Sequence, residues 1–192
     1  MNRTMARAAL ATALLTSACG ASVGSWVRED YAAQDQGQVK HLSLQVRGLP
    51  ADQQKLWYLM ARRYINQHRN FILRPAELAH EATLGVACAG QEGAMGLEVA
   101  QQVRGAEVAL QVGARLQRCR DGQDVWTGQV RGEWSSNDAT VAELKKHYIQ
   151  ELGEAIGPFV APAFLAIKAL VATLPQPLLT GDEEMEKIEL GE

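Results

Sequence analysis

Three segments in the middle of the chain alternate apolar and polar residues, and they constrain the fold more than any other feature. Apolar side chains occupy every second position around Val99, Val112 and Val130. Alternation with a period of two is typical of a strand with one buried face. The turns Arg104-Gly105 and Arg120-Asp121-Gly122 separate the segments and favour hairpins. The sequence therefore predicts an antiparallel three-strand meander with one apolar face.

Helical periodicity surrounds this meander. Residues 52–70 and 141–156 carry apolar side chains at spacings of three and four, and a half-buried strand is predicted before them at 39–47. Phe159–Leu174 is apolar almost all round, so it must be buried in the core, against a partner or at a membrane surface. We expect burial in the core, with Leu165 pointing inward. The fold class predicted is α+β, an antiparallel sheet covered by helices on one face.

The N-terminus has the zones of an export signal. Arg3 and Arg7 give a positive start, Ala8–Leu15 is apolar, and small residues precede Cys19. A positive, apolar and small-residue order is typical of a segment that a signal peptidase removes. The apolar part is shorter than the roughly 20 residues that a permanent span needs. We predict a signal peptide at residues 1–18.

The residues around the cleavage point carry a family resemblance. Leu15-Thr16-Ser17-Ala18-Cys19-Gly20 resembles the bacterial lipobox, with Thr16 at a position where the family usually has Leu or another aliphatic residue. The resemblance implies that Cys19 carries the lipid and that the protein is a membrane-anchored lipoprotein. Gly20, in place of Asp, implies the outer membrane, with the domain facing the periplasm. The alternative is an ordinary secretory signal with a chance cysteine.

Composition divides the rest of the chain into three parts. Residues 19–38 are mostly small and polar and predict a flexible tether. Residues 39–175 contain the predicted strands and helices and form the α+β domain. Residues 176–192 are rich in Asp and Glu and predict a solvated acidic tail.

Two cysteines remain once Cys19 is assigned to lipid. Cys88 and Cys119 would lie in an oxidising compartment, which favours one disulfide between them. Cys119 falls on the polar side of its strand, so the bridge requires a strand end or a bulge. The alternative is two separate buried thiols. Neither cysteine has a second ligand at metal spacing, so we expect no metal site.

Charge and motifs argue against nucleic-acid binding and catalysis. The chain has 19 Lys and Arg against 22 Asp and Glu, without the basic excess of a nucleic-acid binder. His80-Glu81 begins like a zinc-protease motif, but Leu84 stands where the second His is needed. Phosphate-binding and nucleophile-elbow motifs are missing from the sequence. We therefore expect no enzyme and no cofactor.

The predicted order of strands and helices also resembles that of known envelope lipoproteins. From residue 39 to residue 156, the strand pair with Asp121-Gly122-Gln123-Asp124-Val125-Trp126 at its turn is similar to small domains of the curli secretion lipoprotein and the activator lipoproteins of penicillin-binding proteins. This implies a non-enzymatic envelope protein that binds another envelope component, protein or cell wall. A basic group (Arg62, Arg63, His68, Arg69 and Arg74) would contact an anionic polymer or lipid, or form a solvated helix face. The alternative function is a small-ligand or lipid carrier, with Phe159–Leu174 closing a cavity over the sheet.

Overall fold

The three-strand meander is the centre of the fold. In the computed structural model, which describes residues 21–74, 88 and 90–190, its strands are β3 (Gly93–Arg104), β4 (Glu107–Arg118) and β5 (Asp124–Ser135). Gly105 and Gly122 occupy the turns with φ of 65° and 70°, a backbone region that Gly adopts without steric cost. The predicted α+β class and the meander are confirmed.

Two further strands extend the meander into a five-stranded mixed sheet. The strand order is β1-β5-β4-β3-β2, with β1 (Ser22–Val27) and β2 (Leu42–Arg47) at the two edges. β2 pairs in parallel with β3, whereas the other pairs are antiparallel. A helix follows β2 along the chain, and parallel neighbours require such a crossover in place of a hairpin. The expectation of a wholly antiparallel sheet is therefore wrong at this edge.

The first strand lies where a flexible tether was expected. All six residues of β1 pair with β5, from Ser22 opposite Arg131 to Val27 opposite Trp126. A short helix, α1 (Tyr31–Gln34), follows β1. Val23 and Val27 pack against the core. Two inward apolar residues are enough to form this strand, because the edge of β5 offers hydrogen-bond partners to its backbone. The prediction of a tether at residues 19–38 is wrong from residue 22 onward, and the domain begins at β1.

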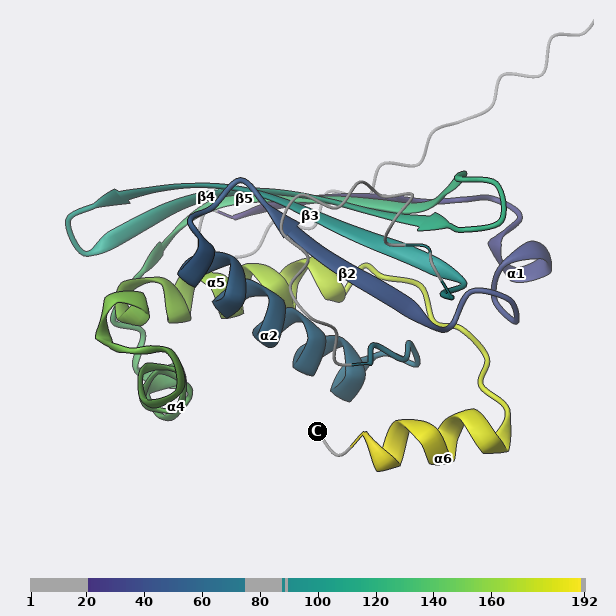
Figure 1. The fold of residues 1–192 in the computed structure, drawn as a ribbon. Helices are drawn as coiled ribbons and strands as arrows, with labels where there is room; N and C mark the ends of the chain where they lie inside the picture. The colour runs from purple at the N-terminus through teal and green to yellow at the C-terminus, as the bar shows by residue number, and fades with distance from the viewer. Residues whose placement is uncertain (1–20, 75–87, 89, 191–192) are drawn as a thin grey trace, which may run out of the picture.

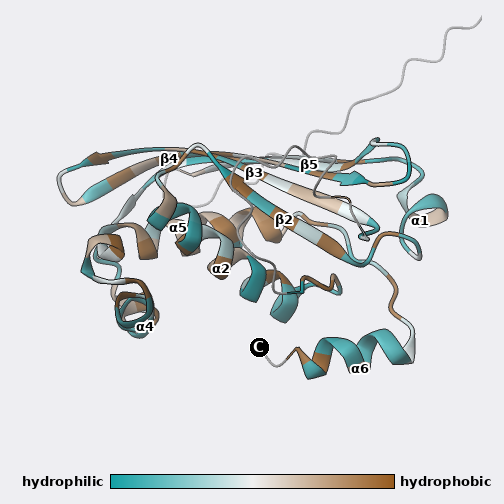
Figure 2. Ribbon diagram, in the orientation of Figure 1, coloured by the Kyte–Doolittle hydropathy of each residue, from teal (hydrophilic) through white to brown (hydrophobic). Residues whose placement is uncertain are grey.

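Three helices lie on one side of the sheet (Figure 1), two of them packed against its strands and the third packed against the other two helices. They are α2 (Ala51–His68), α4 (Ala142–Leu152) and α5 (Gly157–Val171), with short 3₁₀ turns η1 (Ala139–Val141) and η2 (Glu154–Ile156) beside α4. The strands alternate in hydropathy (Figure 2), and the inward residues of β4 from Val108 to Leu116 are buried. Trp126, Val130 and Trp134 of β5 are buried on the same face, as predicted.

Helix α5 is the core helix that the apolar run predicted. The stretch Glu154–Val171 is long and apolar enough to cross a membrane, yet 56% of it is buried inside the fold, as in the core helix of a globular domain. Ile167 and Leu170 are its deepest large side chains, at 1% and 2% exposure. Leu165 is only partly buried, and the inward face of α5 lies about half a helical turn away from it. The prediction that Leu165 points into the core is therefore not accurate.

The acidic end forms a helix in place of a solvated tail. Helix α6 (Gly181–Glu189) begins at a capping box, in which the Thr180 hydroxyl accepts from the Glu183 backbone amide and the Glu183 carboxylate accepts from the Thr180 amide. This box satisfies amides that the first turn of a helix leaves unpaired. None of the residues of α6 is buried. The domain therefore extends through α6, beyond the expected boundary at residue 175.

The packing of α5 gives a first prediction. Leu170→Ala should lower the free energy of unfolding by about 2–5 kcal/mol, because the buried side chain leaves a cavity between helix and sheet. Leu178→Ala makes the same change at a side chain that is 62% exposed, and should stay within about 0.5 kcal/mol of the wild type. Urea unfolding of both variants measures this. Equal losses would show that Leu170 does not anchor α5.

Candidate functional site

Among the described residues, no helix packs on the side of the sheet opposite α2 and α5 (Figure 1), and we call this side the helix-free face. It carries a shallow depression of about 670 Å³. Strand register places its side chains in two rows that cross all five strands. The first row is Trp26, Thr127, Arg115, Gly96 and Gln45, and the second is Gly24, Gln129, Gly113, Glu98 and Arg47. The depression therefore spans the sheet from one edge strand to the other.

Glycines make the floor of the depression low. A Cβ at Gly113 would meet no other atom within 4 Å, so the space above the centre of β4 is open. A Cβ at Gly24 would meet the Gln129 side chain at 3.2 Å, so the amide of Gln129 leans over the neighbouring strand. The floor is backbone, and the rim is formed by longer side chains on either side.

The rim side chains are polar apart from one aromatic ring. Trp26 is 47% exposed on edge strand β1. At the opposite edge, Arg47 Nη2 donates to Gln45 Oε1 at 3.0 Å. Arg115 lies 3.6 Å from the carboxylate of Asp124, and its side chain remains 55% exposed. The described residues that line the depression include neither His nor Cys, so the groups present suit hydrogen bonding and stacking better than proton or acyl transfer.

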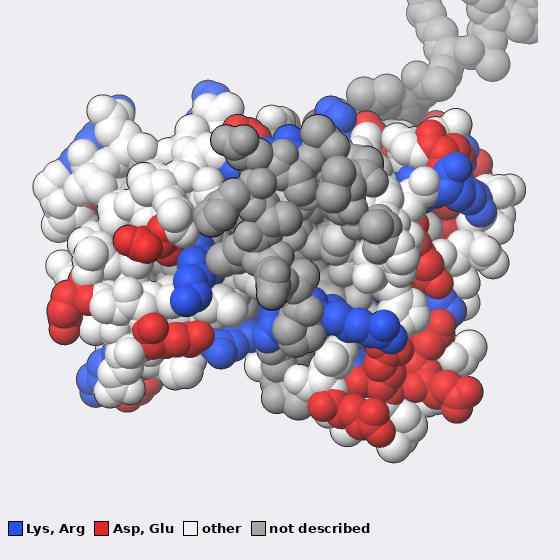
Figure 3. Space-filling model, viewed as in Figure 1, with Lys and Arg blue, Asp and Glu red and all other residues white. Residues whose placement is uncertain are grey.

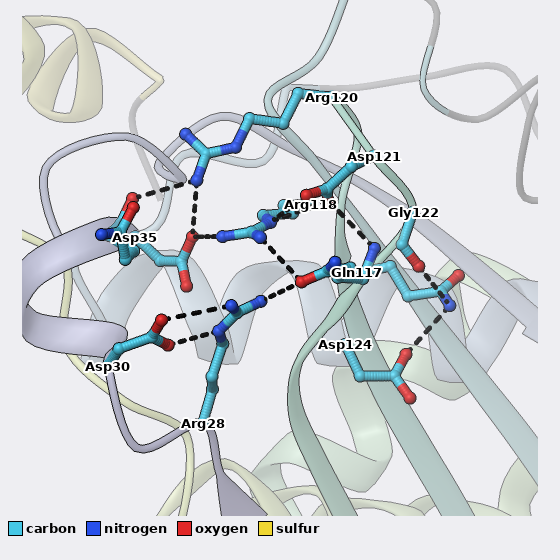
Figure 4. A network of polar contacts seen from close by, with 11 residues as sticks. Arg28, Asp30, Asp35, Gln117, Arg118, Arg120, Asp121, Gly122 and Asp124 are labelled. Carbon is cyan, nitrogen blue, oxygen red and sulfur yellow. Dashed lines mark hydrogen bonds and ion pairs between the residues drawn. The ribbon is translucent and has the colours of Figure 1, made fainter.

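A buried ion-pair network stands at the end of the sheet near α1 (Figure 4). Arg118, the last residue of β4, points inward with its side chain 6% exposed. Its guanidinium donates to Asp35 at 2.8 Å, to Asp121 at 2.7 Å and to Gln123 at 2.8 Å. Hydrogen bonds to both carboxylates raise the pKa of Arg118, and the bond from Arg118 lowers the pKa of Asp121. The network fixes α1 to the β4–β5 hairpin.

The same network reaches the end of β1. Arg28 donates to Asp30 and to the Gln123 side chain, which also accepts from Arg118. Asp35 is fully buried, and its second oxygen Oδ2 has no partner among the described residues. A buried carboxylate held by a buried guanidinium is a structural arrangement, because removing either partner leaves an uncompensated charge.

The two remaining cysteines lie beside this network. Cys88 and Cys119 are joined in a disulfide with their Cα atoms 5.3 Å apart. β4 ends at Arg118, so Cys119 is the first residue beyond the strand. The disulfide therefore forms at a strand end, which is one of the two arrangements that the position of Cys119 on the polar side requires. Cys19 lies outside the described residues. Among the described residues, His, Cys, Asp and Glu do not gather in any group of three or more suited to a metal ion.

The predicted basic group on α2 is engaged within the molecule. Arg69 donates to the backbone carbonyls of Val171 and Ala172 at 2.9 and 2.8 Å, which satisfies the C-terminal end of α5. Arg63 pairs with Glu151 at 3.3 Å and lies over the Tyr148 ring. The other members are also occupied: Arg62 is buried, His68 lies against Tyr64, and Arg74 pairs with Glu186. Arg63 and Arg69 thus connect α2 to α4 and α5, whereas His68 and Arg74 remain exposed, and the contact of this group with an anionic polymer or lipid stays a prediction.

Charge holds α6 in place. Glu183 pairs with Lys40, and Glu186 pairs with Arg74 and with His41 Nε2 at 3.0 Å. Figure 3 shows the acidic side chains gathered over α6 next to a band of Lys and Arg. The hydrogen bond from Lys40 lowers the pKa of Glu183 to about 2. This acidic segment therefore neutralises a basic edge of the domain.

Comparison with solved structures finds partial similarity at low identity and with TM-scores below 0.5. No family model matches the chain, and no curated protein matches it. A PelC dodecamer from Paraburkholderia phytofirmans is 15% identical, covering 73% of this chain and 98% of that one, with a TM-score of 0.45. Lipoprotein GNA1162 from Neisseria meningitidis is 14% identical over 59% and 96% of the two chains, with a TM-score of 0.37. The LpoB C-terminal domain from Salmonella enterica is 16% identical over 55% and 89%, with a TM-score of 0.35.

The buried pair gives a second prediction. Asp35→Ala should lower the free energy of unfolding by about 3–5 kcal/mol, because it leaves Arg118 buried with one carboxylate fewer. Asp30→Ala removes a carboxylate from the exposed end of the same network and should leave the melting temperature nearly unchanged. Thermal unfolding of both variants measures this. A small effect of Asp35→Ala would show that the buried pair is not needed.

The α6 contacts give a third prediction. Because the folded pKa of Glu183 lies below its ordinary value of 4.5, its stabilising effect is complete above pH 4.5 and is lost as the pH falls towards 2. Carboxyl-carbon NMR should therefore show Glu183 titrating near pH 2. Lys40→Met should move this midpoint towards 4.5 and detach α6 at a higher pH. An unchanged midpoint in Lys40→Met would contradict the assigned pairing.

Proposed function

We propose that this chain is a lipid-anchored, non-enzymatic envelope protein that binds another envelope component through the helix-free face of its sheet. In this proposal the signal peptide of residues 1–18 is removed and Cys19 carries the lipid. The domain is held at the outer membrane and faces the periplasm. The Cys88–Cys119 disulfide suits that oxidising compartment.

The main support for this proposal is the short stretch of chain between Cys19 and β1. β1 begins at Ser22, three residues after Cys19. An extended chain covers at most about 3.3–3.6 Å per residue, so a lipid on Cys19 would hold the edge of the sheet within about 10 Å of the anchor. The depression starts on this same strand, with Gly24 and Trp26. The proposed anchor would therefore keep the binding face beside the membrane, without a long tether between them.

The chemistry of the depression favours binding over catalysis. Its described lining combines amide, guanidinium, hydroxyl and carboxylate groups with one exposed indole ring. These groups give directional hydrogen bonds and a flat apolar surface. Thr127 and Glu98 lie on β5 and β3, on either side of β4, and no hydrogen bond joins them among the described residues, so they do not form the paired nucleophile and base of covalent catalysis.

The carrier alternative receives no support at the junction of α5 and the sheet. A Cβ at Gly128 would lie 2.4 Å from the Trp126 ring and 2.9 Å from Leu170 of α5. Side chains therefore fill the space in which a lipid carrier with α5 as a lid would need its cavity. A ligand held by this domain would instead have to bind on the open face.

The anchor can be tested with matched cysteine variants. Cys19→Ala should abolish labelling of the protein by radioactive fatty acid in the cell, because the acceptor thiol is lost. The double variant Cys88→Ala, Cys119→Ala retains Cys19 and should still be labelled. Gel autoradiography after membrane fractionation measures both. Labelling of Cys19→Ala would place the lipid elsewhere and refute the proposed anchor.

The binding face can be tested in the same cells by photocrosslinking. A photoreactive residue at Gln129, in the depression, should give a discrete crosslink to an envelope component. The same residue at Lys146, exposed on α4, is the control and should not give that product. Crosslinks of equal yield at both positions, or none at Gln129, would contradict the assignment of the helix-free face.

A further inference from the structure

We propose that the depression binds a glycan, a polyhydroxylated chain lying across the strands of the sheet. This inference rests on the proposed function, and it names the chemical class of the envelope component that the helix-free face takes. The two rows of side chains, the exposed Trp26 and the glycine floor carry the argument.

Trp26 is the aromatic platform at one end of the rows. The chain has four Trp residues, and Trp57, Trp126 and Trp134 are all buried. Trp26 alone presents its ring to solvent, at 47% exposure. An indole is a wide apolar surface with one polar N–H, which suits a ligand with an apolar C–H face and polar edges. A sugar ring has this construction.

Beyond Trp26, the two rows consist of hydrogen-bonding side chains and glycines. Thr127, Arg115 and Gln45 follow in the first row, and Gln129, Glu98 and Arg47 in the second. Amide and guanidinium groups are planar and hold two or more donors or acceptors side by side, which matches adjacent hydroxyls on a sugar. Gly113 leaves the floor between the rows open, because a Cβ there would meet no atom within 4 Å, whereas the Gln129 side chain leans over Gly24.

The dimensions suit an extended chain more than a single small molecule. Neighbouring strands lie about 4.7–4.9 Å apart, so groups on five strands are distributed over about 19 Å. The depression is shallow and continues across the width of the sheet. A chain of several sugars would contact successive strands, with the first ring stacked on Trp26.

The same features disfavour other classes of ligand. Glu is depleted at the centre of protein–protein interfaces, whereas the second row here contains Glu98. A lipid tail would need an apolar lining, and Trp26 is the one large apolar side chain in the two rows. A nucleic acid would need an excess of cations, but Glu98 lies in the rows and Arg115 already faces Asp124.

Acrylamide quenching of tryptophan fluorescence tests the proposal directly on the full-length protein in detergent micelles. The probes are chitohexaose, cellohexaose and a hexamer of a linear uronic acid, each titrated to 10 mM. Because the other three indoles are buried, protection from quenching reports on Trp26. We expect at least one hexamer to protect it, with saturation, and the corresponding monosaccharide to bind at least tenfold more weakly.

Variants connect binding to the depression. Gln129→Ala and Gly113→Leu should each weaken binding of that hexamer at least tenfold, the first by removing an amide and the second by filling the floor. In isothermal titration calorimetry, Trp26→Ala should do the same and Trp26→Phe should retain most of the affinity. Gln102 lies on the same face outside this depression, so Gln102→Ala is the control and should leave the affinity for the hexamer unchanged. Circular dichroism checks that each variant is folded.

The outcomes separate this inference from the proposed function. Saturable protection that Gly113→Leu abolishes supports the glycan site. If none of the three hexamers protects Trp26, or if Gly113→Leu and Gln102→Ala bind equally well, the glycan inference is overturned. A discrete protein crosslinked at Gln129 together with no glycan binding would overturn the glycan and leave the binding face standing. Failure of both experiments would reject both proposals.

Discussion

The contact between Trp126 and α5 is the constraint on which the rest of the structure depends. The indole of Trp126 lies over Gly128 on the inner face of β5, so closely that a Cβ there would be 2.4 Å from the ring. Leu170 of α5 packs against the same place. Burying these side chains removes apolar area from water at about 25 cal/mol per Å². This contact places all the core helices on one side of the sheet, and it leaves the opposite side uncovered by α2, α4 and α5.

Strand alternation then determines what the uncovered side presents. Because side chains point to opposite faces in turn, the register that buries Val112 and Val130 also places Gly113 and Gln129 side by side on the other face. A slip of one residue would bury the polar row and expose the core. The composition of the two rows is thus tied to the stability of the core, although none of the side chains in these rows belongs to that core.

The sequence predicts well what depends on local pattern. The meander, the buried Trp126 and the apolar helix follow from periodicity within a few residues. The sequence does not predict β1, because a strand with only Val23 and Val27 as apolar residues on its inward face needs the free edge of β5, which is distant in sequence. The docking of α6 was missed because Lys40 and Glu183 meet only in the folded chain, although the capping box at Thr180 was a readable helix signal. The two rows require the relative register of five strands, which a sequence of this kind does not reveal.

The polar networks explain how the remaining segments stay in place without burying apolar residues. α6 buries none of its side chains and is held by Glu183 and Glu186, whereas the end of β1 is joined through Arg28 and Gln123 to Arg118. β1 has β5 as its one described sheet neighbour, so this second attachment limits the freedom of the edge strand. Trp26 of β1 lies two residues before Arg28, which follows the strand. The buried Arg118–Asp35 pair thus supports the aromatic end of the depression, even though neither residue lines it. The Arg118 network and the Trp26 end of the depression are therefore connected through β1, the edge strand that the proposed lipid would hold near the membrane.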